Sequence, residues 1–261
     1  MVRRPPTSPP PAPPALPPRP LEGQVAMVTG GARRIGQAIA LDLAAAGARI
    51  ALAYLRSREA AVETARLIAA AGSEAWLLRL DVTREAQIAR AMLRLERHWG
   101  RLDLLVNNAG VYEEAEFSQL RRAQWDEMLA TNLTGPFLVS QAALPLLRRA
   151  RPGRIVHLAS VGGVRAFPRH AHYSVSKAAL IHLTRVMARA LAPAIQVNAV
   201  APGLIVTRRQ PRGWEARLVE RTPARRAGSP RDVAEAVRFF ATCTPFITGQ
   251  VLLVDGGLSL A

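Results

Sequence analysis

Tyr173 and Lys177 are the residues of this chain whose types and spacing could carry acid–base chemistry. On a helix, side chains four residues apart lie on one face, one turn from each other. A free tyrosine titrates near ~10, which is too high for efficient proton transfer at neutral pH. A nearby ammonium favours the phenolate and lowers the pKa of the tyrosine. The pair therefore predicts a group that exchanges a proton with a substrate oxygen.

Lys177 is the only lysine among the 35 basic residues of the chain, and the other 34 are arginine. A tyrosine and a lysine at this spacing occur by chance in many helices, and one lysine could survive by accident. A chain this rich in arginine indicates that arginine has replaced lysine wherever it serves. A compact, mobile ammonium is not interchangeable with a guanidinium. We therefore favour a functional role for Lys177 over chance.

The formal net charge of +16 raises the question of a nucleic-acid or acidic-lipid partner. The arginines are spread along the whole chain, without a run of five or more basic residues, and only 5% of residues are aromatic. No stretch approaches the ~20 apolar residues of a membrane span. We predict no nucleic-acid and no membrane partner. The single cysteine, Cys243, excludes an internal disulfide and a cysteine-cluster metal site. It favours a reducing, cytoplasmic location, and no metal site is predicted.

Residues 1–20 differ from the rest of the chain, since ten of them are proline. Such a segment cannot form a helix or a central strand, and we expect a disordered or polyproline tail. It has no apolar core of the kind that a secretory signal requires. It could be a ligand for a proline-recognition domain, but a non-functional extension is the interpretation we favour. Residues 21–261 are predicted to form a single domain.

After this tail, apolar strands alternate with amphipathic helices. The expected strands are residues 25–28, 49–54, 75–80, 102–106, 154–159, 195–200 and 250–254. The expected helices are residues 35–46, 57–71, 84–99, 123–149, 173–191 and 232–241. Pro136 and Pro145 predict kinks or breaks in the longest of these helices. The alternation indicates an α/β fold with a parallel sheet covered on both faces. Such sheets bind ligands at the carboxyl ends of their strands.

A glycine-rich turn, Thr29 to Gly36, follows the first strand and opens the first helix. This context is what a nucleotide-phosphate turn requires. Gly30 permits a tight turn, amide groups at the helix N-terminus face the pyrophosphate, and Gly36 lets the helix pack closely on the strand. The sequence therefore predicts a dinucleotide site at this turn.

The end of the second strand, Tyr54 to Ser57, indicates which dinucleotide binds. A site that prefers NAD places a carboxylate there to hold the ribose 2′-hydroxyl. No carboxylate lies between Ile50 and Arg58, where the chain has Arg56 and Ser57 instead. Together with the two arginines of the phosphate turn, a guanidinium and a hydroxyl suit a 2′-phosphate. We predict NADP(H) rather than NAD(H).

Two further strand ends carry candidate cofactor contacts. Asp81 and Val82 follow the third strand, where the carboxylate could bind an adenine amine or cap the next helix; the sequence leaves both open. Asn107 to Gly110 ends the fourth strand with small residues that would let the backbone lie against a cofactor.

Taken in this order, these motifs resemble the single-domain branch of the short-chain dehydrogenase/reductase family. The resemblance covers residues 21–261. It rests on Thr29–Gly36, Asp81–Val82, Asn107–Gly110, Asn132, Ser160, Tyr173 with Lys177, Pro202–Gly203, Thr248–Gln250 and Asp255–Gly257. The family implies a Rossmann-type, doubly wound parallel sheet of seven strands, and a homodimer or homotetramer packed through the long helices.

The resemblance also implies roles for individual residues. Tyr173 would be the acid in reduction and the base in oxidation. Lys177 would lower its pKa and hold the nicotinamide ribose, and Ser160 would bind the substrate carbonyl and the developing oxyanion. Asn132 would anchor a water that relays protons to Lys177. The residues expected to bind the cofactor are Gly30, Arg33, Arg34, Ile35, Gly36, Tyr54, Arg56, Ser57, Asp81, Val82, Asn108, Ala109, Gly110, Tyr173, Lys177, Pro202, Gly203, Ile205 and Thr207.

The substrate is left open between subgroups. Arg34 stands where the family's usual turn has glycine, and this turn resembles that of pteridine reductases. That subgroup often has aspartate where this chain has Ser160, so the catalytic residues resemble those of a general carbonyl or 3-oxoacyl reductase. A small-molecule carbonyl or pterin-like substrate is expected. An NADPH-binding regulator that has kept the fold is the non-enzyme alternative, and nucleotide-sugar epimerase or dehydratase chemistry is disfavoured by the short chain.

Three segments are expected to line the substrate pocket: residues 112–117, 161–172 and 204–214. Arg208, Arg209 and Arg212 in the last segment could meet an anionic substrate, although a solvated loop is favoured. His170 and His172 near Tyr173 have no metal-site spacing and are interpreted as pocket wall or surface.

Overall fold

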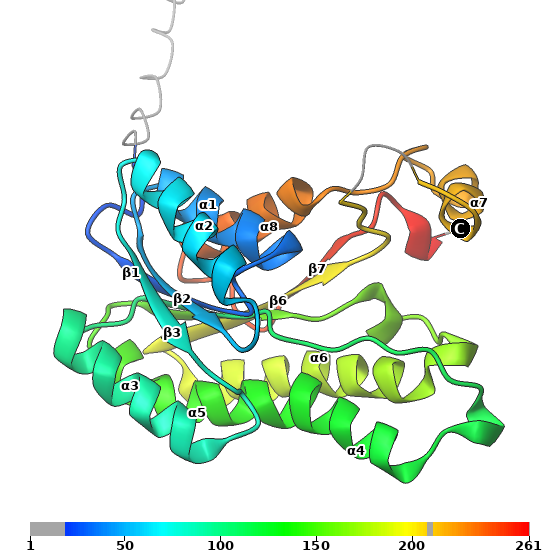
Figure 1. Ribbon diagram of the computed structural model, residues 1–261, viewed down its shortest axis with the longest axis horizontal. Coiled ribbons are helices and arrows are strands. Elements are labelled where there is room, and N and C mark those ends of the chain that lie inside the picture. Colours follow the sequence, from blue (N-terminus) through cyan, green and yellow to red (C-terminus); the bar gives the residue numbers. More distant parts are fainter. Residues whose placement is uncertain (1–18, 208–210, 261) are drawn as a thin grey trace, which may run out of the picture.

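The computed structural model describes residues 19–207 and 211–260 of the 261-residue chain (Figure 1). The predicted tail therefore lies almost entirely outside the described residues, as do Arg208 and Arg209 of the predicted pocket segment. Arg19, at the end of the predicted tail, donates a hydrogen bond to the Gly72 carbonyl at 3.1 Å. Among the described helices, none is long and apolar enough to cross a membrane.

Seven parallel strands form one sheet in the order β3-β2-β1-β4-β5-β6-β7. The strands are β1 (Val25–Thr29), β2 (Arg49–Tyr54), β3 (Ala75–Arg79), β4 (Leu104–Asn107), β5 (Gly153–Leu158), β6 (Ile195–Pro202) and β7 (Val251–Val254). Every residue of β1 and of β6 is buried, as expected for strands covered on both faces. The predicted Rossmann-type, doubly wound sheet is confirmed.

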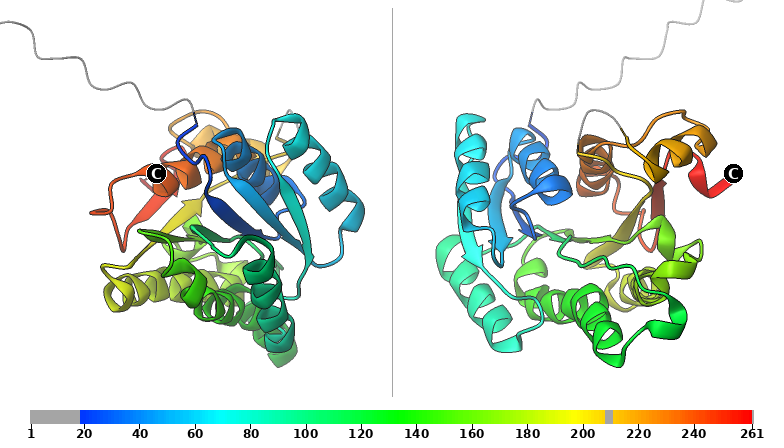
Figure 2. Two further views of the ribbon diagram at one scale, coloured as in Figure 1. Left: turned by 90° about the vertical axis from the view of Figure 1, so that its left-hand side faces the viewer. Right: turned by 45° about the vertical axis from the view of Figure 1, so that its right-hand side comes forward.

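Helices cover both faces of the sheet (Figures 1 and 2). One layer holds α1 (Arg34–Ala45), α2 (Arg58–Ala70) and α8 (Pro230–Thr242). The other layer holds α3 (Glu85–Trp99), α4 (Arg122–Leu129), α5 (Gly135–Leu147) and α6 (Ala171–Leu191). Apolar side chains of each layer pack on the strands as two large buried clusters, and these fix the carboxyl ends of the strands along one edge.

The long helical stretch predicted at residues 123–149 is deformed, and the deformation places a polar side chain. A π-helical turn, Ala130–Thr134, joins α4 to α5. Pro136 follows at the start of α5. In an ordinary α-helical turn its ring would clash with the carbonyl of Asn132, four residues earlier. The α-helix is thus interrupted just before Pro136, as predicted, whereas Pro145 lies inside α5 without ending it.

One helix was not predicted from the sequence. Helix α7 (Trp214–Arg221) follows the segment expected only to line the pocket, and it buries none of its residues fully. Half of its eight residues are charged, and such a short helix gives little periodic signal. It lies beside the C-terminal residues at the open end of the sheet (Figures 1 and 2).

Candidate active site

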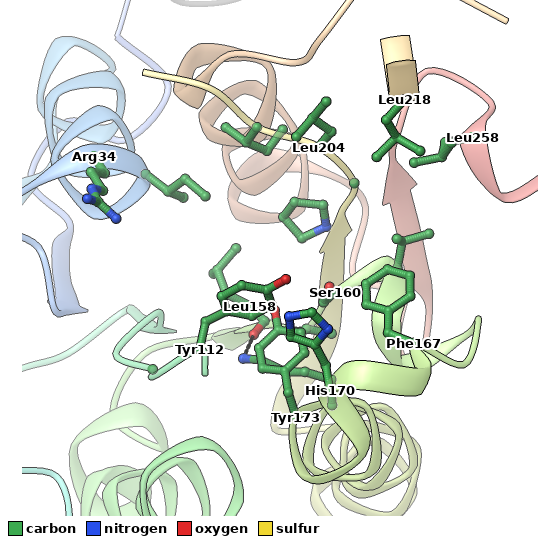
Figure 3. Close-up of a pocket in the computed structure, with 18 of the residues that line it drawn as sticks. Arg34, Tyr112, Leu158, Ser160, Phe167, His170, Tyr173, Leu204, Leu218 and Leu258 are labelled. Carbon is green, nitrogen blue, oxygen red and sulfur yellow. Dashed lines mark hydrogen bonds between the residues drawn. The ribbon is translucent and has the colours of Figure 1, made fainter. Parts of the chain in front are cut away.

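A cavity of about 620 Å³ opens at the carboxyl ends of β4, β5 and β6 (Figure 3). Eleven of the predicted catalytic and cofactor-binding residues line it. They are Arg34, Ile35, Asn108, Gly110, Ser160, Tyr173, Lys177, Pro202, Gly203, Ile205 and Thr207. The remaining predicted residues lie behind this surface or at the ends of β2 and β3, as described below. This is the edge at which an open parallel sheet is expected to bind its ligand.

Helix α6 and the end of β5 bring Tyr173, Lys177 and Ser160 together. The Tyr173 hydroxyl shares a hydrogen bond with Ser160. The Lys177 ammonium lies 5.8 Å from the centre of the Tyr173 ring and donates to the Leu158 carbonyl at 2.8 Å. Ser160 caps a short 3₁₀ turn, Val161–Gly163, by accepting a hydrogen bond from the Gly162 amide at 3.0 Å. The Ser160 hydroxyl thus keeps its proton available for another acceptor.

Burial decides the charge states of the pair. It raises the pKa of Tyr173 above the ordinary value, against the opposing effect of the Ser160 hydrogen bond. Burial also lowers the pKa of Lys177 to about 8. The net pKa of Tyr173 is therefore raised in this structure, opposite to the lowered value that the sequence predicted. The Lys177 ammonium is directed at the Leu158 carbonyl. Burial disfavours the Tyr173 phenolate more than the Ser160 hydrogen bond favours it.

Asn132 lies in the π turn, fully buried behind the cavity. Its amide group donates to the Val111 carbonyl at 2.9 Å and to the Ser176 hydroxyl at 3.2 Å, and its oxygen accepts from the Val111 amide at 2.8 Å. A β-carbon placed on Gly110 would lie 3.1 Å from this oxygen and 3.7 Å from the Lys177 nitrogen. Asn132 therefore holds the turn after β4 and the face of α6 against each other.

The glycine-rich turn leaves no room for side chains. Gly30 has a positive φ of 63°, and a β-carbon on Gly36 would overlap the Gly30 carbonyl oxygen. The Asn108 side chain donates to the carbonyls of Thr29 and Gly30 at 2.9 and 3.1 Å. The Thr29 hydroxyl in turn accepts the backbone amides of Asn108 and Ala109, each at 3.0 Å. The turn after β4 and the turn after β1 are thereby fixed as one surface.

The start of α1 can receive an anion. The first turn of α1 has no acidic residue and no side chain capping its amide groups, and those groups attract negative charge. Arg34 lines the cavity here with a left-handed φ of 51°, a conformation that a side chain adopts at a cost of about 1 kcal/mol. Arg33 stands before it as the N-cap, in an extended conformation.

The ends of β2 and β3 carry the other predicted cofactor residues. Tyr54 is the last residue of β2, Arg56 is exposed, and Ser57 precedes α2 without capping it through its side chain. Burial works to raise the pKa of Asp81, but hydrogen bonds from Thr83 and the charges of Arg84 and Arg56 hold it below its ordinary value.

The sequence left open whether Asp81, after β3, binds an adenine amine or caps the next helix. The N-cap of α3 is Arg84, so Asp81 is not the N-cap residue; it accepts from the Thr83 amide and hydroxyl at 2.9 and 2.7 Å. Val82 is buried, and a β-carbon on Gly135 would meet it at 2.9 Å. Together with the turn after β1 and the uncapped start of α1, this strand end makes a surface that fits a nicotinamide dinucleotide.

The other side of the cavity was foreseen only as residue ranges. His170 lines the cavity, whereas His172 is fully buried and does not. Trp214 and Leu218 of α7 and Leu258 near the C-terminus also line it, and no motif in the sequence pointed to the last two. Arg212 donates its backbone amide to Glu215 at 3.2 Å. Within the described residues, no group of three histidine, cysteine, aspartate or glutamate side chains could hold a metal ion.

Comparison with known proteins places this geometry in a family. A family model described as enoyl-(acyl carrier protein) reductase matches residues 30–259. The 3-oxoacyl-[acyl-carrier-protein] reductase of Synechocystis sp. is 36% identical over 241 residues, covering 91% of this chain and 98% of the relative. The granaticin polyketide synthase putative ketoacyl reductase 2 of Streptomyces violaceoruber is 41% identical over 247 residues, covering 92% and 97%.

Solved structures agree with these relatives. A short-chain dehydrogenase/reductase from Serratia marcescens superposes with a TM-score of 0.86 at 37% identity, covering 92% of this chain and 99% of that chain. A dehydrogenase/reductase from Sinorhizobium meliloti has the same TM-score at 37% identity, covering 91% and 96%. The chain therefore belongs to the short-chain dehydrogenase/reductase family and is an oxidoreductase.

Proposed function

We propose that this protein reduces a substrate carbonyl with NADPH, using Tyr173 as the proton donor. The observation that carries the proposal is the meeting of the Tyr173 and Ser160 hydroxyls at the cavity, with the only lysine of the chain buried beside them. Two hydroxyl donors converging on one point can hold a carbonyl oxygen and stabilise the negative charge that develops on it.

The charge states support reduction. The raised pKa of Tyr173 keeps the phenol protonated at neutral pH, so it holds the proton that the substrate oxygen needs. With a pKa of about 8, Lys177 is mostly charged at pH 7 and stabilises the phenolate that remains after proton transfer. When bound, the nicotinamide cofactor supplies the hydride. Asn132 keeps the Gly110 turn and α6 in register, and its part in a proton relay remains a prediction.

NADP(H) is the proposed cofactor. Arg34 lines the cavity at the start of α1, and Arg56 with Ser57 follows β2, where no carboxylate is present between residues 50 and 58. Guanidinium groups suit a phosphate, and an NAD site would need an acceptor for the 2′-hydroxyl. Gly30, Gly36, Asn108 and Ala109 would form the backbone surface under the dinucleotide.

A 3-oxoacyl thioester is one candidate substrate, because several relatives carry the name 3-oxoacyl-[acyl-carrier-protein] reductase. A pterin is the other candidate, supported by Arg34 in the phosphate turn. The serine at position 160 favours the carbonyl reductase over the pteridine reductase, since a hydroxyl is a ready donor to a ketone oxygen. The regulator alternative is weakened by the complete set of polar side chains around the cavity.

The test is oxidation of reduced nicotinamide, followed by its absorbance, with NADPH and NADH assayed separately. Acetoacetyl thioester, a dihydropteridine and simple ketones would serve as substrates. We expect oxidation of NADPH with at least one ketone-bearing substrate. Preference for NADH would contradict the assignment of Arg56 and Ser57, and silence with all substrates despite NADPH binding would favour the regulator.

Assembly and location remain predictions. Phe137 on α5 and Val175 and Val186 on α6 are exposed apolar residues on the long helices through which a homodimer or homotetramer is expected to pack. Sedimentation equilibrium would test this, and a mass near the 28.2 kDa of the chain would contradict it. The proposed cytoplasmic location is based on the single cysteine, which favours a reducing compartment.

A further inference from the structure

The substrate side of the cavity is lined by aromatic rings, in a chain with only 5% aromatic residues. We use "substrate side" for the part of the wall made by Tyr112, Val161, Phe167, His170, Tyr173 and α7, together with Leu204 and Leu258. Its rings belong to Tyr112, Phe167, His170, Tyr173 and Trp214. Because aromatic residues are scarce in this chain, composition alone does not explain their grouping on the substrate side.

Four of these rings, those of Tyr112, Phe167, His170 and Tyr173, contact one another around the proposed proton donor (Figure 3). Tyr112 stacks on His170 with ring centres 4.6 Å apart and an interplanar angle of 20°. The edge contact between Tyr112 and Tyr173 has ring centres 4.8 Å apart at 90°. Phe167 meets His170 edge-on at 6.2 Å. A ligand ring that joins this cluster would therefore lie immediately beside the atom that delivers the proton.

The aromatic cluster is held in place before a ligand binds. The Ala115 amide donates to the Arg169 carbonyl at 2.9 Å. The Arg169 guanidinium forms ion pairs with Glu114 at 2.7 Å and Glu116 at 2.9 Å. These contacts fasten the loop that carries Tyr112 to the turn that carries His170. The stack is thus a formed surface, which reduces the ordering that binding requires.

Opposite the aromatic rings lie aliphatic side chains. Leu204, Leu218 and Leu258 face Tyr112, His170 and Tyr173 across the cavity (Figure 3). Tyr112 is 57% exposed and Trp214 63% exposed, although both line the cavity. Large aromatic surfaces left open at a concave site are typical of surfaces that a ligand covers.

We infer that the substrate carries an aromatic ring on a short linker from the reacting carbonyl, and that this ring packs against Tyr112. The inference rests on the proposed carbonyl reduction and names its substrate class. Aromatic pairs are favoured beyond the area that they bury, so a phenyl group should exceed a saturated ring of similar size by about two- to tenfold in kcat/KM.

The test compares 4-phenyl-2-butanone with 4-cyclohexyl-2-butanone under saturating NADPH. The carbonyl is separated from the ring by two methylenes in both ketones, so its intrinsic reactivity is the same. We expect a two- to tenfold preference for the phenyl ketone, at about the strength of one aromatic pair. Tyr112→Leu should bring the ratio close to one, while Tyr112→Phe should keep it. Phe117→Leu, an exposed aromatic residue outside the cavity lining, should leave the ratio unchanged.

The outcomes separate this inference from the function beneath it. Equal or better turnover of the cyclohexyl ketone by the wild-type protein would overturn the inference and leave carbonyl reduction standing. Reduction of acetoacetyl thioester without turnover of either ketone would have the same meaning. A phenyl-to-cyclohexyl ratio in Tyr112→Leu equal to that of the wild type would also overturn the inference. Failure to oxidise NADPH with any of the three compounds would overturn the proposed function and the inference with it. The wild-type ratio decides the matter even where Tyr112→Leu fails to fold.

Discussion

The proposed cofactor side of the cavity is built from segments with short local motifs that act mainly through the backbone, whereas the proposed substrate side acts through side chains from separate loops. The cofactor side comprises the turn 29–36, the ends of β2 and β3 and residues 107–110. There, glycines and hydrogen bonds between turns shape the surface. On the substrate side, Tyr112, His170, Leu218 and Leu258 meet from four segments. A scaffold that keeps its cofactor can thus change its substrate by altering loop side chains alone.

A large effect on both stability and NADPH affinity is expected where the cofactor side has no space. A β-carbon at Gly36 would overlap the Gly30 carbonyl oxygen and would lie 2.6 Å from Nδ2 of the Asn108 side chain. Gly36→Ala should therefore lower the unfolding free energy by about 1–3 kcal/mol and weaken NADPH binding by up to about a hundredfold. Denaturant unfolding and NADPH fluorescence titration measure the two effects.

Gly72→Ala is the matched control. Gly72 has a positive φ of 76° and open space around it at the end of α2. Gly72→Ala should lower the unfolding free energy by about 1 kcal/mol without changing NADPH affinity. Equal NADPH affinity in Gly36→Ala and the wild type would show that the turn is not the cofactor surface.

The junction between the two sides is the buried Lys177. Lys177→Met should reduce kcat by about a hundredfold or more, since the phenolate loses its neighbouring charge. The same change should raise the unfolding free energy at pH 7 by about 2 kcal/mol, because the pKa of Lys177 in the folded protein is about 8, below its usual 10.5.

The size of this stability effect depends on pH. The wild-type protein carries the penalty of a buried ammonium below pH 8, and deprotonation relieves it as the pH rises from about 8 to 10.5. The stability advantage of Lys177→Met should shrink over that window. Urea unfolding of both proteins at pH 7 and pH 10 measures it. An advantage that stays constant with pH would contradict the account.

Cofactor preference tests the cofactor side alone. Arg56→Asp removes a guanidinium and adds the carboxylate that NAD sites use at this strand end, so the NADPH-to-NADH ratio of kcat/KM should fall by about tenfold or more. Arg90→Asp, the same charge change on the exposed face of α3, should leave the ratio as it was. Indistinguishable ratios for the two variants would remove Arg56 from the cofactor site.

The smallest effect is the pH dependence of the wild-type rate. The kcat/KM for carbonyl reduction reports groups of the free enzyme, and the pKa of Lys177 is about 8. We expect kcat/KM to reach half its maximum near pH 8 and to fall further above it. Lys177→Met should lack this limb. A flat profile through pH 9 for the wild type would contradict a role for the charged lysine.

The sequence predicted the sheet and most of its helices well, because those depend on local patterns. Tyr173 and Lys177 share one helix turn, and the turn from Thr29 to Gly36 is continuous, so spacing alone indicated their proximity. Asn132 was suggested only by the family resemblance, since a π turn leaves no simple periodicity in the sequence.

Contacts across loops were beyond such patterns. The stack of Tyr112 on His170 depends on how two loops pack, and the sequence indicated only the ranges that contain them. The short helix α7 was missed because its eight residues are too few to give a clear periodic pattern. The pKa of Tyr173 is raised rather than lowered because burial, which spacing does not reveal, outweighs the opposing hydrogen bond of Ser160.

The most direct test of the central claim is the single-turnover rate of NADPH oxidation by Tyr173→Phe, measured beside its NADPH affinity. Phenylalanine keeps the ring and removes the hydroxyl that meets Ser160. The account predicts a fall in rate of about a hundred- to ten-thousandfold with NADPH binding unchanged. A variant that turns over as fast as the wild type would show that Tyr173 is not the proton donor.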